Sequence, residues 1–308
     1  VPDFPDEVRF WKLIEKYKVS WTELSPALIR TQMIKDEKLF KDLDLSSLRM
    51  ICTGGEPWTE KPWKWLFQVI GKSKVPIMNS AGGTEVSGSI LHCCLHRPFK
   101  VGSFNAPIPG MSADILNLDG KKVSTNEMGE LVMRKSSIGL TKSLWNDDKR
   151  YIDNYWSVIK DYWVHGDLAS RDADGHWYLH GRSDDTIKVS GKRIGPSELE
   201  SVIVKSGKAK EVAAVGIPDA NKGSKIILSI VPAENNDQKE SFFEDLVIKD
   251  LGKSFKPDKV IFVKDLPKTR NMKIMRRVIK SCLANQDPGD LSTLLNPESV
   301  EEIRSHAI

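Results

Sequence analysis

Two acidic positions and a basic run have the residue types needed to handle a phosphorylated ligand. Asp167 follows a short apolar run and a glycine, a pattern that predicts a strand end, where ligands commonly lie. Its carboxylate can accept two hydrogen bonds from a vicinal diol such as that of ribose. Thr84 can donate a hydrogen bond to a phosphate oxygen, and Glu85 offers the hard oxygen ligand that Mg²⁺ prefers. A single acidic residue of this kind is more commonly a solvated surface charge, and a Thr-Glu pair is more commonly a helix cap. The basic residues of the run 267–277 are likewise more commonly part of a solvated face.

The stretch of residues 163–198 contains Asp167 and a series of turn and strand patterns after it. A D-x-D-G turn pattern at 172–175 precedes an alternating strand at 176–180, so a hairpin is predicted. Arg182 follows at the end of that strand. Asp184 then comes where the chain would leave one sheet and begin another.

Alternating helices and strands upstream predict a mostly parallel sheet. Glycine-rich turns are expected after two of its strands, as GGEP at 54–57 and NSAGGTE at 79–85. In such a sheet ligands bind at the carboxyl ends of the strands, where both turns would fall. The predicted elements are helices at 7–17, 28–33 and 58–70 and strands at 19–24, 48–53 and 75–78.

The pattern changes twice further along the chain. From residue 100 to 182, short runs between Gly, Pro and Asn predict a small β-barrel or sheet, with strands at 112–118 and 129–133. All nine tryptophans lie at or before Trp177, so the composition changes near Asp184. An α+β arrangement is predicted after it, and the end of the chain is expected to be loosely ordered with a short final helix. The elements of this last part are helices at 196–205 and 240–251 and strands at 211–217, 225–231 and 259–263.

The ordered run of residues 163–198 resembles the adenylate-forming (AMP-binding) superfamily, most closely its short- and medium-chain acyl-CoA synthetases. The resemblance implies an α/β multidomain fold, with part of a large N-terminal domain followed by a small, mobile α+β C-terminal domain. The large domain would contain a mostly parallel α/β layer and a small distorted β-barrel. The implied boundaries are 1–99 for the α/β layer, 100–183 for the barrel, 184–285 for the mobile domain and 286–308 for a tail.

The same resemblance assigns roles to individual residues. Lys273, in a run PKTRNMKIMRR that is nearly identical to a family motif, would be the catalytic lysine, with Thr84 beside the α-phosphate and Glu85 on the metal. The other assignments are Gly55, Glu56 and Pro57 against the adenine, Asp167 on the ribose with Arg182 supporting it, Arg193 at the nucleotide, Gly82 and Gly83 at the acyl pocket, Asp184 as the hinge, and Ser190 and Gly191 at the CoA tunnel.

The function implied by the resemblance is an AMP-forming acid–thiol ligase. A carboxylic acid and Mg-ATP would give an acyl-adenylate, and the acyl group would then pass to CoA, so ATP, Mg²⁺ and CoA are the expected cofactors and substrates. Two alternatives remain open: an adenylation domain that loads a carrier protein, and a catalytically inactive remnant or scaffold of the same fold.

Three positions depart from the family pattern. Ala81 stands where an aromatic residue usually packs on adenine, and Met272 stands where a glycine usually precedes the catalytic lysine. Gly82 stands where acetate-specific members carry a tryptophan that closes the acyl pocket. Because a buried aromatic covers roughly 150 to 250 Å², the hypothesis is an acid larger than acetate. The alternative is that another side chain fills the gap.

The family's glycine-rich loop for the β- and γ-phosphates has no counterpart in this sequence. The chain is therefore expected to be the C-terminal half or more of a synthetase, and not to turn over alone. It would be a truncated piece, the product of a split gene with a separate N-terminal half chain as partner, or an inactive remnant.

Composition excludes several other classes. The 308 residues are 40% hydrophobic, enough for two or so globular domains, and 46 basic residues against 42 acidic ones give a net charge of +4, too balanced to indicate nucleic-acid binding. Four cysteines without C-x-x-C spacing fit a reducing compartment. No apolar run approaches the roughly 18 residues of a membrane span, and the first ten residues lack the apolar core of a signal peptide. A cytoplasmic location is expected.

Overall fold

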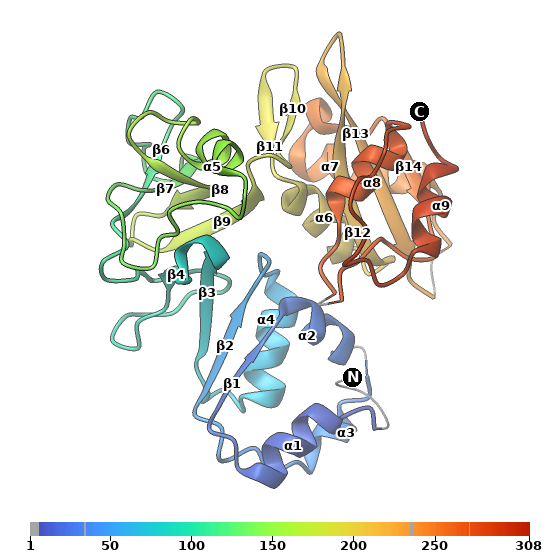
Figure 1. Cartoon of the computed structure of the whole chain (residues 1–308). Coiled ribbons are helices and arrows are strands. Elements are labelled where there is room, and N and C mark those ends of the chain that lie inside the picture. The colour runs from blue at the N-terminus through green and yellow to red at the C-terminus, as the bar shows by residue number, and fades with distance from the viewer. Residues whose placement is uncertain (1–5, 34, 235–236, 271) are drawn as a thin grey trace. The chain divides into compact units, whose positions relative to one another are not determined.

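A computed structural model describes residues 6–33, 35–234, 237–270 and 272–308 (Figure 1). The first five residues and Asn271 of the basic run therefore lie outside the described residues. The chain divides into two compact units, Val1–Leu179 and His180–Ile308. The division falls inside the 163–198 stretch.

The first sheet of the first unit has the strand order β1-β2-β3-β4-β5. The pairs β1/β2 and β2/β3 are parallel, as predicted, but β3/β4 and β4/β5 are antiparallel. Fully buried Trp11, Ile29, Phe40 and Leu66 form the centre of an apolar cluster that the helices share with β1 and β2. The strands are β1 (Trp21–Leu24), β2 (Met50–Gly54), β3 (Ile77–Gly83), β4 (Gly88–His92) and β5 (Ala106–Pro107), and the helices are α1 (Arg9–Tyr17), α2 (Pro26–Gln32), α3 (Lys38–Lys41), α4 (Glu60–Trp65) and the π-helical turn η1 (Leu66–Ile70).

Strand β3 corrects the prediction of a glycine turn directly after residue 78. The strand continues to Gly83 because β4 pairs with it, Ala81 opposite Leu91 and Gly83 opposite Gly88, so the backbone of the glycine-rich segment is hydrogen-bonded as sheet. The turn comes later, as the 3₁₀ turn η2 (Thr84–Val86). Local glycine content predicted a loop, and a tertiary strand partner overrode it.

The second sheet corrects the prediction of a barrel. Its order is β6-β7-β8-β9, and within the described residues no pairing returns from β9 to β6. A barrel closes only when its last strand pairs with its first, and the four strands of this sheet do not do so within the described residues. The strands are β6 (Ala113–Leu116), β7 (Gly129–Met133), β8 (Trp163–Arg171) and β9 (Trp177–Arg182), and helix α5 (Asp148–Tyr155) packs on β8.

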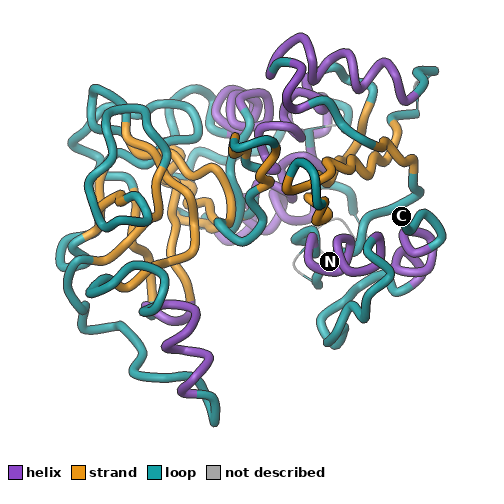
Figure 2. Tube along the Cα trace, turned by 90° about the horizontal axis from the view of Figure 1, so that it is seen from above, coloured by secondary structure: helices purple, strands orange, loops and turns teal. Residues whose placement is uncertain are grey.

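The second unit is α+β, as predicted, and its central sheet is buried on both faces. Successive residues of β12 point to opposite sides: Val212 and Ala214 join one apolar cluster, whereas Ala213 and Val215 join the other. Helices α6 and α7 cover the first face and α8 and α9 the second, and Figure 2 shows helices on both sides of these strands. The elements are β10 (Ile187–Val189), β11 (Lys192–Ile194), α6 (Pro196–Lys205), β12 (Ala209–Asp219), β13 (Gly223–Pro232), α7 (Glu240–Leu251), η3 (Lys253–Phe255), β14 (Lys259–Phe262), α8 (Arg276–Leu283) and α9 (Glu298–Arg304).

The C-terminal segment is ordered, in contrast to the loose tail that its Pro and Gly content predicted. Val300 and Ile303 of α9 are 5% and 0% exposed, and Leu291 and Leu294 pack against the same cluster. The segment also forms a bridge from Leu294 to Thr269. Burial against the second face of the sheet, which composition alone does not reveal, orders it.

No helix in the described part of the chain combines the length and the apolar character needed to cross a bilayer.

The hairpin between β8 and β9 is held by one carboxylate, that of Asp172. Its Oδ1 accepts the backbone N–H groups of Asp174 and His176 at 3.0 and 2.9 Å, and its Oδ2 accepts Lys100 Nζ at 2.6 Å. Burial by itself would raise the pKa of Asp172, but the Lys100 ammonium and the His176 N–H outweigh it and lower the pKa to about 2.

Asp172→Asn should therefore destabilise the first unit in a pH-dependent way. A carboxyl whose pKa is lower in the folded state stabilises the fold above its unfolded pKa of 3.8, and this contribution is lost as the pH falls through the folded value of about 2. Urea unfolding should show the largest difference from the parent at neutral pH and a shrinking difference below about pH 4. Asp174→Asn, whose side chain is 72% exposed, is the matched control and should cost less. A pH-independent difference would contradict this account.

Candidate functional site

Strand β8 contains a bulge at the predicted ligand carboxylate. Between the pairs Glu130–Leu168 and Val132–Val164, β7 has one residue and β8 has three, residues 165–167, so β8 carries two extra residues here. Gly166 has φ +82°, a value that favours glycine. The sequence predicted that Asp167 ends a strand. The structure instead places it within β8, where a bulge redirects side chains.

The bulge brings a histidine to Asp167. His165 Nε2 lies 3.2 Å from Asp167 Oδ2, and the two side chains are 8% and 14% exposed. A carboxylate offers roughly four lone-pair sites, more than one imidazole contact uses. The imidazole contact thus orients the carboxylate.

Glu85 lies next to this pair. An ideal Cβ at Gly83 would be 3.0 Å from Glu85 Oε2 and 3.4 Å from His165 Cε1, so the same backbone position touches both side chains. Tyr155 Oη donates to Glu85 Oε1 at 3.1 Å. The Tyr155 ring stacks on Trp163, with centroids 5.2 Å apart and planes 4° apart, and Trp163 in turn lies 5.6 Å from the His165 ring. The structure therefore joins Glu85 and Asp167 through one continuous set of contacts.

Sequence reasoning missed Tyr155 and His165. His165 directly precedes the Gly-Asp pair, so its closeness to Asp167 was available as a local signal. Tyr155 lies on α5, seventy residues from Glu85, and no local pattern links the two. Its role depends on how α5 packs against β8.

Thr84 and Glu85 occupy the turn η2, directly after β3. Thr84 is exposed, and the Glu85 carbonyl accepts the N–H of Thr141 at 2.7 Å. Ser87, with φ +52°, closes the turn. The hydroxyl of Thr84 is thus presented at the surface from an anchored backbone.

The Gly55–Glu56–Pro57 segment begins beside β3, since Gly54 at the end of β2 pairs with Ser80. Gly55 has φ +96°, which requires glycine-like freedom. Both carboxylate oxygens of Glu56 lie 2.9 Å from Arg30 Nη2. This ion pair holds the Glu56 side chain, so the surface offered to a ligand here is mainly backbone.

Gly82 has no room for a side chain in the direction of its missing Cβ. A Cβ there would lie 2.0 Å from the Gly88 carbonyl oxygen and 2.6 Å from Ser89 Cα, both on β4. The space that sequence comparison assigned to a missing indole is therefore occupied, along this direction, by the backbone of the neighbouring strand.

The residues of this site are suited to binding a magnesium ion that is also coordinated by substrate phosphates. The described residues contain no group of three or more His, Cys, Asp and Glu side chains that could enclose a metal. Mg²⁺ commonly binds through one or two carboxylates and substrate phosphates. Glu85, held through Oε1 by Tyr155, supplies one such carboxylate.

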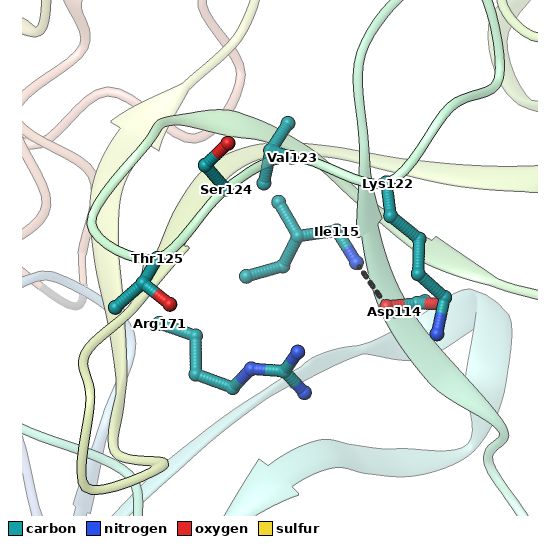
Figure 3. Close-up of a pocket in the computed structure, with 7 residues that line it drawn as sticks. All are labelled: Asp114, Ile115, Lys122, Val123, Ser124, Thr125 and Arg171. Atoms are coloured by element: carbon teal, nitrogen blue, oxygen red, sulfur yellow. Dashed lines mark hydrogen bonds and ion pairs between the residues drawn. The ribbon is translucent and has the colours of Figure 1, made fainter.

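A hollow of about 50 Å³ lies on the second sheet, away from these residues. Figure 3 shows Lys122 and Arg171 on either side of Asp114, whose carboxylate also accepts Arg134 at 2.8 Å. The volume is far below the roughly 300 Å³ of small-molecule pockets. None of the residues singled out in the sequence lines it.

In the second unit, Ser190 and Gly191 connect β10 to β11. Their φ values of +49° and +82° are typical of the type I′ turn that joins short hairpins. The Ser190 N–H donates to the Lys222 carbonyl at 2.8 Å, and Arg193 lies opposite Lys188 with an exposed side chain. Hydrogen bonding to the β12–β13 turn therefore fixes the tip of this hairpin.

Arg182 ends β9, and Asp184 lies in the turn that follows it. Arg182 Nε is 3.2 Å from Asp184 Oδ1, and the side chains are 47% and 74% exposed. Thr186 Oγ1 donates to the Arg182 carbonyl at 3.2 Å. The segment predicted to be a hinge is thus a surface turn with an ion pair across it.

Lys273 lies on a small hairpin with an exposed side chain. The Thr269 N–H donates to the Lys273 carbonyl at 2.9 Å, and Lys273 N–H donates to Thr269 Oγ1 at 3.2 Å. Met272 has φ +63°, so the position before the lysine does adopt the left-handed conformation that a glycine would take without strain.

A sequence model of the AMP-binding enzyme family matches residues 1–145, and a model of the AMP-binding enzyme C-terminal domain matches residues 198–273. The chain belongs to the AMP-binding enzyme family.

Curated members of the family resemble nearly the whole chain. Acetyl-coenzyme A synthetases of Helicobacter pylori (strain P12) and Methanothrix thermoacetophila are 38% and 37% identical over 98% of it. The aligned region is 48% and 47% of those proteins, so the chain spans about half the length of the curated relatives it matches.

Solved structures agree on the fold. Acetoacetyl-CoA synthetase from Streptomyces lividans has a TM-score of 0.85 over 99% of this chain and 47% of its own, at 22% identity, which confirms the predicted α/β multidomain fold. An anthranilate CoA ligase in complex with anthranoyl-AMP has a TM-score of 0.72 over 87% of this chain and 50% of its own, at 26% identity.

Gly82→Ala should destabilise the first unit by about 1–3 kcal/mol, because the added methyl overlaps the backbone of β4. Gly88→Ala, on the facing strand, is the matched control: its Cβ would meet nothing within 4 Å, and a change within about 0.5 kcal/mol is expected. Urea unfolding of the two variants measures the difference. Equal effects would show that the close approach of β3 and β4 is not what requires glycine at position 82.

Proposed function

We propose that the chain carries the nucleotide-handling residues of an acyl-CoA synthetase, an acid–thiol ligase that forms AMP. The observation that carries the proposal is the joined set of Glu85, Tyr155, His165 and Asp167 in a member of the AMP-binding enzyme family. The names of the curated relatives and the anthranoyl-AMP held by a structural relative support the same chemistry.

Asp167 is assigned to the ribose. Its carboxylate, oriented by His165 at 3.2 Å, can accept both hydroxyls of a vicinal diol. The backbone of Gly55, Glu56 and Pro57 is assigned to the adenine, and Arg182 and Arg193 to support of the nucleotide. Ala81 provides no aromatic ring for the base.

Glu85 and Thr84 are assigned to the phosphates. Glu85 would hold a Mg²⁺ ion that neutralises phosphate charge, and the Thr84 hydroxyl would donate to an oxygen of the α-phosphate. The Tyr155 hydroxyl bond keeps the Glu85 carboxylate in place before any ligand arrives. Such preorganisation avoids the cost of reorienting the group during reaction.

In the first step a carboxylate oxygen attacks the α-phosphorus of ATP in line, and the bond to the pyrophosphate oxygen breaks. Charge grows on the non-bridging α-phosphate oxygens, which Lys273 and Thr84 stabilise. In the second step the CoA thiol, losing its proton, attacks the acyl carbon and releases AMP. Rotation about Asp184 would exchange Lys273 for the Ser190–Gly191 turn, which lines the thiol's path.

The acid is proposed to be larger than acetate. Support comes from the absence of an indole at Gly82, a position whose Cβ direction is filled by β4. Neither Gly82 nor Gly83 has open space in the direction of its missing Cβ, so the proposal rests on the sequence difference alone.

Asp167→Asn should weaken AMP binding by the 308-residue chain about tenfold or more, because a hydrogen bond to a charged acceptor contributes roughly 1.5–3 kcal/mol. Isothermal titration of AMP measures the change in Kd. Asp119→Asn, an exposed turn carboxylate, is the control and should bind like the parent. Unchanged affinity in Asp167→Asn would remove the ribose assignment.

Acid size can be tested without turnover by titrating non-hydrolysable acyl-sulfamoyl-adenosines. Butyryl, hexanoyl and benzoyl analogues should bind more tightly than the acetyl analogue, because each buried methylene contributes about 0.8 kcal/mol. Tightest binding by the acetyl analogue would show that the pocket is closed to larger acids despite Gly82.

A further inference from the structure

The hairpin that carries Lys273 is rooted in a network of charges around a buried lysine, whose partners Glu211 and Asp265 are 21% and 44% exposed. Lys268, at the base of this hairpin, is 6% exposed, although lysine is almost never fully buried unless it is paired. Its Nζ lies 2.6 Å from Glu211 Oε2 on β12 and 2.6 Å from Asp265 Oδ1. Burial by itself would lower the pKa of Lys268, but the two carboxylates outweigh it and the pKa is raised.

Asn296, from the C-terminal segment, completes the network. Its Oδ1 accepts the Lys268 backbone N–H at 3.0 Å, and its Nδ2 donates to Asp265 Oδ2 at 2.7 Å and to the Leu266 carbonyl at 2.8 Å. Asn296 is 7% exposed. One amide thus ties the charged pair to the backbone at the root of the hairpin.

The same C-terminal segment pairs with the hairpin through its backbone. Leu295 N–H donates to the Lys268 carbonyl at 2.8 Å, and Arg270 N–H donates to the Thr293 carbonyl at 3.2 Å. On its other side, the hairpin closes through a bridge between Lys268 and Ile274. The root of the hairpin is therefore held by β12, by Asp265 and by residues 293–296.

Burial of the Lys268 ammonium costs desolvation that offsets much of its attraction to the two carboxylates, so these contacts add little stability by themselves. The network instead restricts the orientation of the base of the hairpin, since each of its hydrogen bonds forms only within a narrow range of geometry. The Lys273 loop is short and exposed, so its orientation depends on its root.

We propose that Lys268, Glu211, Asp265 and Asn296 are positioning residues that fix the orientation of the Lys273 hairpin, and that residues 293–296 belong to this positioning device. The proposal rests on the proposed function in one respect, the use of Lys273 at the α-phosphate. The structural part, a hairpin held in register by the network, stands independently of that use.

Hydrogen–deuterium exchange of the 308-residue chain tests the structural part. In Lys268→Met and Asn296→Ala, the amides of Thr269, Met272 and Leu295 should exchange about tenfold faster or more, a change equivalent to roughly 1.4 kcal/mol of local opening. Amides of the β13 core, such as those of Ile227 and Leu228, should keep the parent's rates. Lys280→Met, which removes an exposed lysine from α8, is the matched control and should leave both sets unchanged.

Two outcomes of that experiment overturn the proposal. Unchanged exchange in the hairpin would show that the network does not hold it. Equal acceleration in the hairpin and in β13 for both variants would show that the network only stabilises the second unit. Asn296→Ala, which removes no charge, keeps the test decisive if Lys268→Met fails to fold.

Acid-dependent ATP–pyrophosphate exchange tests the link to Lys273 in the chain complemented by the N-terminal half of a synthetase, because the 308-residue chain is not expected to turn over alone. Lys268→Met and Asn296→Ala should lower kcat about tenfold or more with KM for ATP changed less than about twofold, and Lys268→Arg should recover part of the loss. A parent that shows no exchange activity and no AMP binding would count against the proposed function while leaving the hydrogen-exchange result to decide the positioning role. A fall in kcat without faster exchange in the hairpin would overturn positioning as its cause.

Discussion

The first unit depends on the close approach of β3 and β4 at Gly82, where an added Cβ would lie 2.0 Å from a backbone oxygen of the facing strand. Because the strands meet so closely, β3 is held as sheet as far as Gly83, and the turn that bears Thr84 and Glu85 begins there. A Cβ added at Gly83 would then lie 3.0 Å from Glu85 Oε2 and 3.4 Å from His165 Cε1. A side chain at either glycine would move the carboxylate assigned to the metal away from the one assigned to the ribose.

The site is built on rigid elements, although its residues come from distant parts of the chain. The bulge at Gly166 turns Asp167 toward His165, and the stacked rings of Tyr155 and Trp163 fix the hydroxyl that holds Glu85. Bulges are common next to active sites because they redirect a side chain without breaking the sheet. The groups proposed to meet the nucleotide are therefore oriented by packing and hydrogen bonds before a ligand binds.

In the second unit, the exposed Lys273 lies on a short hairpin whose position depends on contacts at its base. Its sheet is buried on both faces, which gives β12 a fixed position from which Glu211 can reach Lys268. The C-terminal segment contributes the Asn296 side chain, and the backbone of residues 293–296 forms hydrogen bonds with the hairpin. Both features sit at the root of the hairpin, where a small displacement would be amplified at its tip.

The sequence by itself determined the local elements and the chemical candidates. Helices α6 and α7 and strand β7 have the predicted bounds, because apolar periodicity records which face of an element is buried. The ordered motif of residues 163–198 indicated the family, and Asp167 and Glu85 were recognisable as candidate ligand carboxylates.

Only the tertiary structure decided that β3 continues through its glycines and that the second sheet stays open. It also decided that Tyr155 contacts Glu85 and that Lys268 and Asn296 lie together at the base of the Lys273 hairpin. These features arise from partners far away in the chain, such as β4 for Gly82, Glu85 for Tyr155 and Glu211 for Lys268. Local periodicity carries no information about which distant strand or carboxylate a residue will meet, and that is the physical reason the sequence left them undecided.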